Sequence, residues 1–170
     1  MDIFDTELLE FWNCLNKRKV KYIMVGGVAT NLNGYQRSTE DVDVWLKDTK
    51  ANRENFRKAF EDYTGENYAM INNMQIVPGW TYFYLNNGYR LDLLTEMKGL
   101  EGFSFEKCLE LAGVADIDGV EIPFLHINHL LANKRAVNRP KDQIDVIYLE
   151  KIKKYRKKIS LKTTRLKGSC

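Results

Sequence analysis

Gly26-Gly27 and, after a helix-length gap, Arg37-Ser38-Thr39-Glu40-Asp41-Val42-Asp43-Val44 form the stretch of sequence that decides the fold. The apolar run from Lys21 to Val25 predicts a buried strand, which the two glycines end. Helical spacing then predicts a helix as far as Gly34. Glycine at a strand-to-helix turn lets backbone N–H groups approach an anion, so the pair indicates a phosphate-binding turn. Many Gly-Gly pairs are simple turns, and that alternative stays open here.

The two aspartates after the glycine pair lie two residues apart. In a strand, Asp41 and Asp43 therefore project to the same side, while Val42 and Val44 point into a core. Two close carboxylates raise each other's pKa, which is unfavourable unless a cation compensates. Mg²⁺ is the natural cation, because it prefers oxygen ligands and is commonly held by one or two carboxylates plus substrate phosphates. The alternative is a solvated pair on an exposed strand.

A third carboxylate, Asp92, is the only acid in the strand-like run from Tyr89 to Leu94. Aspartate is disfavoured in strands and costly to bury without a partner, so its position indicates a function or an ion pair with Arg37 or Arg90. Two-metal phosphoryl transfer uses a comparable set of acids around two cations.

Together these residues resemble the nucleotidyltransferase fold of the DNA polymerase beta superfamily. The segments His129–Lys134 and Asn138–Asp145 are similar to the helical tail of small bacterial nucleotidyltransferases, including toxins of abortive-infection (AbiE-type) toxin–antitoxin systems and lincosamide-type antibiotic nucleotidyltransferases. The resemblance spans about residues 20 to 150. It implies an α/β (α+β) fold, a mixed β-sheet flanked by helices with helices at the C-terminal end.

The resemblance also implies an activity: transfer of a nucleoside monophosphate from an NTP to an acceptor hydroxyl, with release of pyrophosphate and with Mg²⁺ or Mn²⁺ as cofactor. The implied catalytic and metal-binding residues are Asp41, Asp43 and Asp92, and the implied nucleotide-binding residues are Gly26, Gly27, Arg37, Thr39, Lys134, Arg139 and Lys141. Asp142 and Asp145 are expected to hold the cations or cap the last helix. The acceptor is left open between a tRNA end, a partner protein and a small antibiotic.

One residue departs from the pattern of this superfamily. Many active members carry Gly-Ser where this chain has Gly26-Gly27, and their serine hydroxyl touches the nucleotide phosphate. A Gly-Gly version occurs in toxin-like and antibiotic-modifying branches. Two alternatives therefore stand beside the enzyme: a catalytically degenerate nucleotide- or partner-binding module, and an antibiotic nucleotidyltransferase.

Charge divides the chain of 170 residues into two parts. Residues 1–150 carry 17 basic and 23 acidic residues and are expected to form a single domain, whereas residues 151–170 carry nine Lys or Arg and no acid. This basic tail, Lys151 to Cys170, predicts contact with RNA, DNA or an acidic partner. The toxin–antitoxin resemblance separately implies a cognate antitoxin or other partner protein. The alternative is a solvated end of the last helix.

Other features of the sequence narrow the class of protein. The sequence has no apolar run of membrane-spanning length and an acidic N-terminal segment, so we expect a cytoplasmic protein without a membrane partner. Three widely spaced cysteines predict neither disulfides nor a zinc site. Trp80 and Tyr82, near Pro78-Gly79, are candidates for a base-stacking platform over the site or for ordinary sheet packing.

The remaining elements follow from hydrophobic periodicity and turn residues. We expect an N-terminal amphipathic helix, a charged helix over 53–63, a short helix over 105–111, and two final helices that divide before Pro140. Further strands are predicted over 74–77, 81–85, 89–94, 114–117 and 120–124, with hairpin turns at Asn86-Asn87-Gly88 and Asp118-Gly119.

Overall fold

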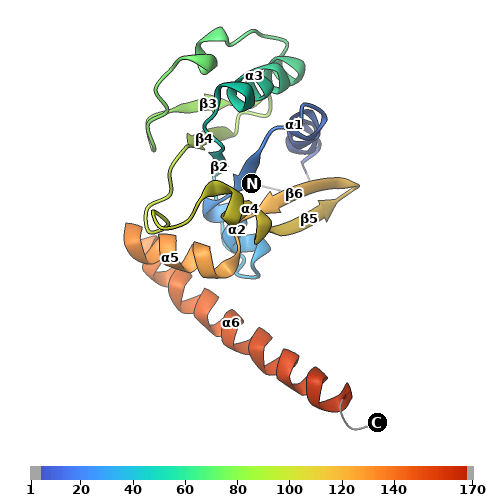
Figure 1. Ribbon diagram of the computed structural model, residues 1–170, viewed down its shortest axis with the longest axis vertical. Coiled ribbons are helices and arrows are strands. Elements are labelled where there is room, and N and C mark those ends of the chain that lie inside the picture. Colours follow the sequence, from blue (N-terminus) through green and yellow to red (C-terminus); the bar gives the residue numbers. More distant parts are fainter. Residues whose placement is uncertain (1–4, 168–170) are drawn as a thin grey trace.

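A six-stranded mixed sheet with helices on both faces forms the body of the protein, in a computed structural model that describes residues 5–167 and the side chains of residues 5–159 (Figure 1). The fold class predicted from the sequence is confirmed. In chain order the elements are α1 (Thr6–Lys17), β1 (Tyr22–Met24), α2 (Gly26–Leu32), β2 (Asp41–Leu46), α3 (Lys50–Thr64), the 3-10 helix η1 (Ala69–Asn72), β3 (Tyr82–Tyr84), β4 (Arg90–Leu94), α4 (Phe105–Glu110), β5 (Gly113–Ile117), β6 (Val120–Phe124), α5 (Ile127–Val137) and α6 (Pro140–Lys167).

The strand order in the sheet is β3-β4-β2-β1-β6-β5. Strands β2 and β4 are parallel neighbours, as are β1 and β6, and the other pairs are antiparallel. In the β2–β4 ladder, Asp43 is opposite Asp92 and Asp41 is opposite Arg90. The acids that lie 49 positions apart in the sequence are thus brought side by side by strand pairing.

Alternation along β2 separates the two faces of the sheet. Val42, Val44 and Leu46 are fully buried in a core shared with α1 and α3. Trp45 packs instead in a second core with α5 and the loop before α4. Asp41 and Asp43 alternate with the valines and so share the face of Trp45. Hydrophobic burial fixes the register of β2, and a slip of one residue would bury both aspartates.

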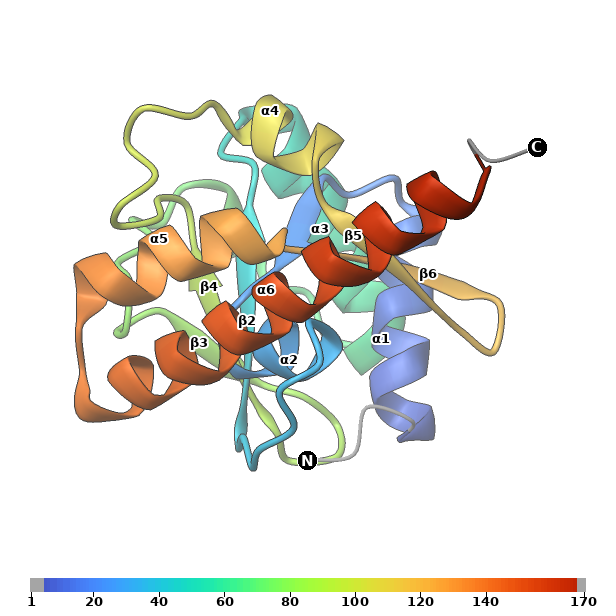
Figure 2. The ribbon, with the colours of Figure 1, turned by 90° about the horizontal axis from the view of Figure 1, so that it is seen from below.

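Helices α5 and α6 pack against each other on the second face and cross the strands, as the view in Figure 2 shows. Asn138 ends α5 in the left-handed conformation, with φ 59°, and Pro140 begins α6, as predicted. Helix α6 extends from the body of the protein (Figure 1) and includes the basic segment from Lys151 onward, of which residues 168–170 lie outside the described part of the chain.

The predicted strand over 74–77 is wrong. A 3-10 helix ends at Asn72 and a turn follows, because side chains take the backbone groups that a strand would use. The Arg53 Nη1 donates to the carbonyl oxygen of Met74 at 2.6 Å, and the Thr81 Oγ1 accepts from the N–H of Val77 at 2.8 Å. Pro78 then removes a donor that a strand would need.

The other predicted turns are confirmed. Gly88 adopts a positive φ in the hairpin between β3 and β4, and Asp118 and Gly119 both do so between β5 and β6, as a two-residue hairpin turn requires. Cys14 and Cys108 are buried free thiols, while Cys170 lies outside the described residues. Among the helices described, none combines the length and apolar character needed to cross a bilayer.

Candidate active site

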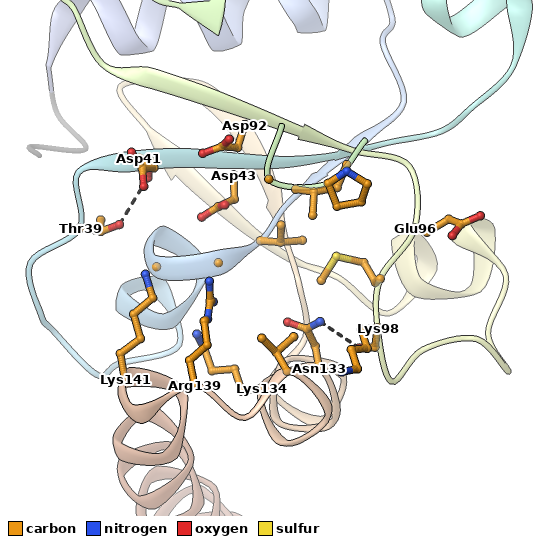
Figure 3. Close-up of a pocket in the computed structure, with 18 of the residues that line it drawn as sticks. Thr39, Asp41, Asp43, Asp92, Glu96, Lys98, Asn133, Lys134, Arg139 and Lys141 are labelled. Atoms are coloured by element: carbon orange, nitrogen blue, oxygen red, sulfur yellow. Dashed lines mark hydrogen bonds between the residues drawn. The ribbon is translucent and has the colours of Figure 1, made fainter. Parts of the chain in front are cut away.

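A cavity of about 650 Å³ opens between the sheet and the start of α6. It is lined by all ten residues that were named from the sequence as catalytic, metal-binding or nucleotide-binding, together with residues from the loops after β4 and before β3. Figure 3 shows carboxylates on the strand side and basic side chains reaching toward them from α5 and α6. The predicted residues lining the cavity are Gly26, Gly27, Arg37, Thr39, Asp41, Asp43, Asp92, Lys134, Arg139 and Lys141.

The carboxylate side of the cavity is built on two paired strands. Asp41 and Asp43 project from β2, and Asp92 projects from the middle of β4 directly beside Asp43. Neighbouring strands lie about 4.8 Å apart, so paired side chains on one face are in electrostatic contact. Rigid strands therefore hold three acids together at the open end of a buried sheet.

Among these three carboxylates, Asp43 has a clearly shifted pKa. Burial, followed by the negative charges of Asp92 and Asp41, raises the pKa of Asp43 to about 6. A hydrogen bond from the backbone N–H of Gly27 and the positive charge of Lys134 lower the same pKa, but only in part. The folded protein thus holds excess negative charge at Asp43, which a cation would relieve.

Asp92 has a partner of its own. The Arg90 Nη2 lies 2.6 Å from the Asp92 Oδ1, so the ion pair considered as an alternative from the sequence is present. Within the described residues, no group of three or more His, Cys, Asp and Glu side chains is arranged to hold a metal ion. Asp92 therefore has a positively charged partner within the protein, whereas its negative charge still acts on Asp43.

The donor set still fits a hard divalent cation. Asp41 and Asp43 offer oxygen ligands on one face, and Mg²⁺ commonly takes one or two carboxylates, with the remaining ligands coming from water and substrate phosphates. Mn²⁺ accepts the same ligands. The raised pKa of Asp43 is the observation that supports this fit, because it marks a carboxylate without enough positive charge nearby.

The glycine turn packs tightly against this carboxylate side. Gly26 has a φ of 62°, and a Cβ at this residue would lie 1.9 Å from the Asp43 Oδ2. A Cβ on Gly27 would lie 2.3 Å from the Thr39 Oγ1. Both positions therefore require glycine, since any side chain would collide with Asp43 or Thr39. The Thr39 hydroxyl also donates to the carbonyl oxygen of Asp41 at 3.3 Å.

The basic side of the cavity rests on two buried carboxylates of α6. The Lys134 Nζ, itself buried, lies 2.7 Å from the Asp145 Oδ2 and 3.3 Å from the Asp142 Oδ1. The Arg139 Nε lies 2.7 Å from the other oxygen of Asp142. Although burial raises the pKa of Asp142, the contacts with Arg139 and Lys134 lower it further than burial raises it. Asp142 and Asp145 thus hold the cations in place, as expected.

Arg37 joins this cluster from the loop before β2. Its guanidinium makes two hydrogen bonds to Asp145, at 2.7 and 3.0 Å, and a third to the carbonyl oxygen of Ser38 at 2.9 Å. The cluster thereby contains three cations and two carboxylates. Arg37 ties α6 to the loop that leads into β2, which is a positioning contact beside its place in the cavity wall.

The polar residues of the cavity wall that were not singled out from the sequence include Glu96, Lys98 and Glu101, in the loop after β4, and Asn133, on α5. The Asn133 Nδ2 donates to the carbonyl oxygen of Lys98 at 2.9 Å (Figure 3). Gly99 has a φ of 82°, and a Cβ there would lie 2.8 Å from the carbonyl oxygen of Ala132. The dipeptide Lys98-Gly99 was the sequence signal that could have pointed to this loop, because a glycine often marks a place where one backbone approaches another closely.

With this geometry established, comparison with protein families gives a clear result. Residues 5–169 match the family model described as "Nucleotidyl transferase of unknown function (DUF2204)". The chain belongs to the DUF2204 family. A search of curated proteins finds no match to this DUF2204 protein.

Two solved structures share the fold of this DUF2204 protein. One is an antigenic nucleotidyltransferase-like protein from Paracoccidioides brasiliensis, with 17% identity, a TM-score of 0.54, and coverage of 86% of this chain and 74% of the other. The second is a candidate nucleotidyltransferase from Thermotoga maritima, with 15% identity, a TM-score of 0.51 and coverage of 90% of both chains. At these identities the likeness establishes a nucleotidyltransferase-like fold.

Proposed function

We propose that this DUF2204 protein is an Mg²⁺-dependent nucleotidyltransferase that moves a nucleoside monophosphate from an NTP to an acceptor hydroxyl and releases pyrophosphate. One observation carries the proposal: the cavity places Asp41, Asp43 and Asp92 opposite the basic residues Lys134, Arg139 and Lys141. An NTP needs both, because its phosphates are anionic and its transfer requires a cation held by carboxylates. Family membership agrees with this class of reaction.

In this proposal, some residues of the cavity neutralise the phosphates and others hold the divalent cation. Arg139 and Lys141 neutralise the phosphates from the exposed side, and Lys134 adds positive charge from the buried side. Asp41 and Asp43 hold the divalent cation, which would supply charge neutralisation at the phosphates. Because Gly26 and Gly27 carry no side chain, the turn lies directly against Asp43 and Thr39, and its backbone faces the triphosphate in this proposal.

The transfer itself forms one bond and breaks one. The acceptor oxygen bonds to the α-phosphorus, the bond between that phosphorus and the bridging oxygen breaks, and pyrophosphate leaves. The proton of the acceptor hydroxyl passes to the Oδ2 of Asp92, since both hydrogen bonds from Arg90 go to the Oδ1. Arg90 is thus a positioning residue that orients the Asp92 carboxylate.

A second candidate function is a catalytically degenerate nucleotide-binding module of the same fold. The ion pair between Arg90 and Asp92 favours it, since a carboxylate stabilised by a guanidinium is a weaker base. Pyrophosphate release in the presence of Mg²⁺, each NTP in turn and bulk RNA separates the two. The enzyme releases pyrophosphate and loses this activity in Asp92→Asn, whereas the module binds an NTP without turnover.

The biological setting that we propose is a cytoplasmic toxin–antitoxin pair, in which the partner would be an acidic protein. The exposed basic side chains of α6 from Lys151 to Lys158 support a contact with such a partner or with RNA. An antibiotic-modifying activity is the competing setting. Lincosamide added to the pyrophosphate assay in place of RNA distinguishes it, because only the antibiotic enzyme would then turn over.

A further inference from the structure

Three exposed aromatic residues stand at the free edge of the sheet, next to the cavity. Trp80 is 82% exposed, Tyr82 45% and Tyr84 63%, and β3, which carries the two tyrosines, is the edge strand beside β4. None of the three lines the cavity, so the platform expected over the site is displaced toward the sheet edge. Trp80 lies two residues before Tyr82 in the chain, and exposed aromatic groups that gather in this way mark interaction surfaces.

Strand register connects these aromatics to the carboxylates. Tyr82 is paired with Asp92, which is in turn paired with Asp43, and Tyr84 is paired with Arg90, which is paired with Asp41. Residues directly opposite each other in a sheet project to the same face. The face that carries the three acids therefore continues without interruption onto the two tyrosines.

Contacts at the patch combine aromatic planes with positive charge. The Arg90 guanidinium lies 4.4 Å from the centre of the Tyr82 ring while it also pairs with Asp92. The Tyr82 and Tyr84 rings are 5.7 Å apart. Pro78 and Gly79, immediately before Trp80, line the cavity itself. Aromatic rings with an interleaved arginine are the groups that stack nucleotide bases and attract their phosphates.

A peptide added to the sheet edge is a poorer fit for this surface. Strand β3 has only three residues, which offers few backbone groups for strand addition, and an added peptide would make little use of Trp80. The patch contains Trp, Tyr and Arg, and base planes match these side chains without requiring a pocket for each one.

We propose that Trp80, Tyr82 and Tyr84, with Arg90, bind unpaired bases of a single-stranded nucleic acid and direct its terminal hydroxyl toward Asp92. The inference rests on the proposed function, because it names the acceptor of that transfer. Arg90, whose guanidinium lies over the Tyr82 ring, is placed to contact a phosphate of the strand as well.

Tryptophan fluorescence reports directly on this surface. Trp12 is 1% exposed and Trp45 5%, so only Trp80 among the three tryptophans of the chain can be quenched by contact with a base. The probe is an oligoadenylate of ten nucleotides, as RNA and as DNA, without NTP. We expect both single strands to quench the emission on binding, and a duplex of the same length to leave it unchanged.

Variants measure the contribution of each ring through the anisotropy of the labelled strand. Each base–aromatic stack is worth about 1–3 kcal/mol, so Trp80→Leu and Tyr84→Leu should each weaken binding by about 5- to 150-fold. Phe103→Leu is the matched control, since Phe103 is 48% exposed in the loop before α4 and does not line the cavity, and it should bind as wild type does. RNA bound more tightly than DNA would identify RNA as the acceptor.

Several outcomes would overturn the proposal. Oligonucleotide binding that leaves Trp80 emission unchanged, or that is equal in Trp80→Leu, would assign binding to the basic side chains of α6. Quenching by the duplex equal to that by single strands would exclude unpaired bases as the ligand. If NTP binding is intact while no strand binds, the acceptor proposal fails and the proposed transferase stands, so the two failures are distinguishable.

Discussion

The substitution Asp43→Asn tests whether the carboxylates of the cavity carry negative charge that the protein's own basic groups do not neutralise. The rise of the Asp43 pKa from 3.8 to about 6 corresponds to about 3 kcal/mol, at about 1.4 kcal/mol per pH unit. Because the pKa is higher in the folded state, the folded protein binds the proton more tightly between pH 4 and 6. The free energy of unfolding therefore falls as the pH rises through this window, and the penalty is complete above pH 6.

Asparagine has nearly the same shape and does not ionise, so the variant lacks this penalty. Since Asp43 is only partly buried, we expect Asp43→Asn to be more stable than wild type by about 1–3 kcal/mol at pH 8, and nearly equal to it at pH 4. Urea unfolding followed by circular dichroism, with EDTA present, measures both values. Glu40→Gln, which removes an exposed charge close by, is the control and should change neither.

A stability difference that is the same at pH 4 and pH 8 would refute this reasoning, as would a less stable Asp43→Asn at pH 8. Either result would mean that the carboxylate is satisfied by the protein alone. The argument for a divalent cation at Asp43 would then lose its physical basis.

Three further predictions concern the walls of the cavity. Gly27→Ala should lower the free energy of unfolding by about 1–3 kcal/mol, since its Cβ would lie 2.3 Å from the Thr39 Oγ1, and a second change, Thr39→Gly, should restore part of the loss in urea unfolding. Lys134→Met should cost about 3–5 kcal/mol in the same measurement, because it leaves two buried carboxylates short of positive charge, and Lys134→Arg should cost less. Lys141→Ala should weaken NTP binding by about tenfold in calorimetry with an unchanged melting temperature, since its exposed side chain faces the cavity; equal affinity would remove Lys141 from the site.

Local sequence signals predicted those parts of the fold that local chemistry determines. Alternation placed Val42 and Val44 in the core and left Asp41 and Asp43 on the opposite face, and Pro140 marked the start of the last helix. The prediction of a strand over 74–77 was wrong because the backbone groups of Met74 and Val77 bond to the side chains of Arg53 and Thr81, which no local sequence pattern reveals.

The sequence predicted which residues form the candidate site, but it did not predict which strands pair there or which side chains form ion pairs. The sequence grouped Asp92 with the other acids through its unusual position in a strand and through the family resemblance, whereas the β2–β4 register that pairs it with Asp43 is a long-range property. The pairing of Arg90 with Asp92 depends on two residues of one strand sharing a face, and it competed with Arg37 as an equal alternative until the structure assigned Arg37 to Asp145. Lys98 reaches the cavity through a loop packed on α5, which no periodicity predicts.

Calorimetric titration of ATP, GTP, CTP and UTP in the presence of Mg²⁺ tests the central claim most directly. The proteins compared are wild type and the double variant Asp41→Asn/Asp43→Asn. We predict that at least one NTP binds wild type only when the metal is present, and that this binding disappears in the double variant. No NTP binding by wild type with Mg²⁺ or Mn²⁺, or equal binding by the double variant, would contradict the account.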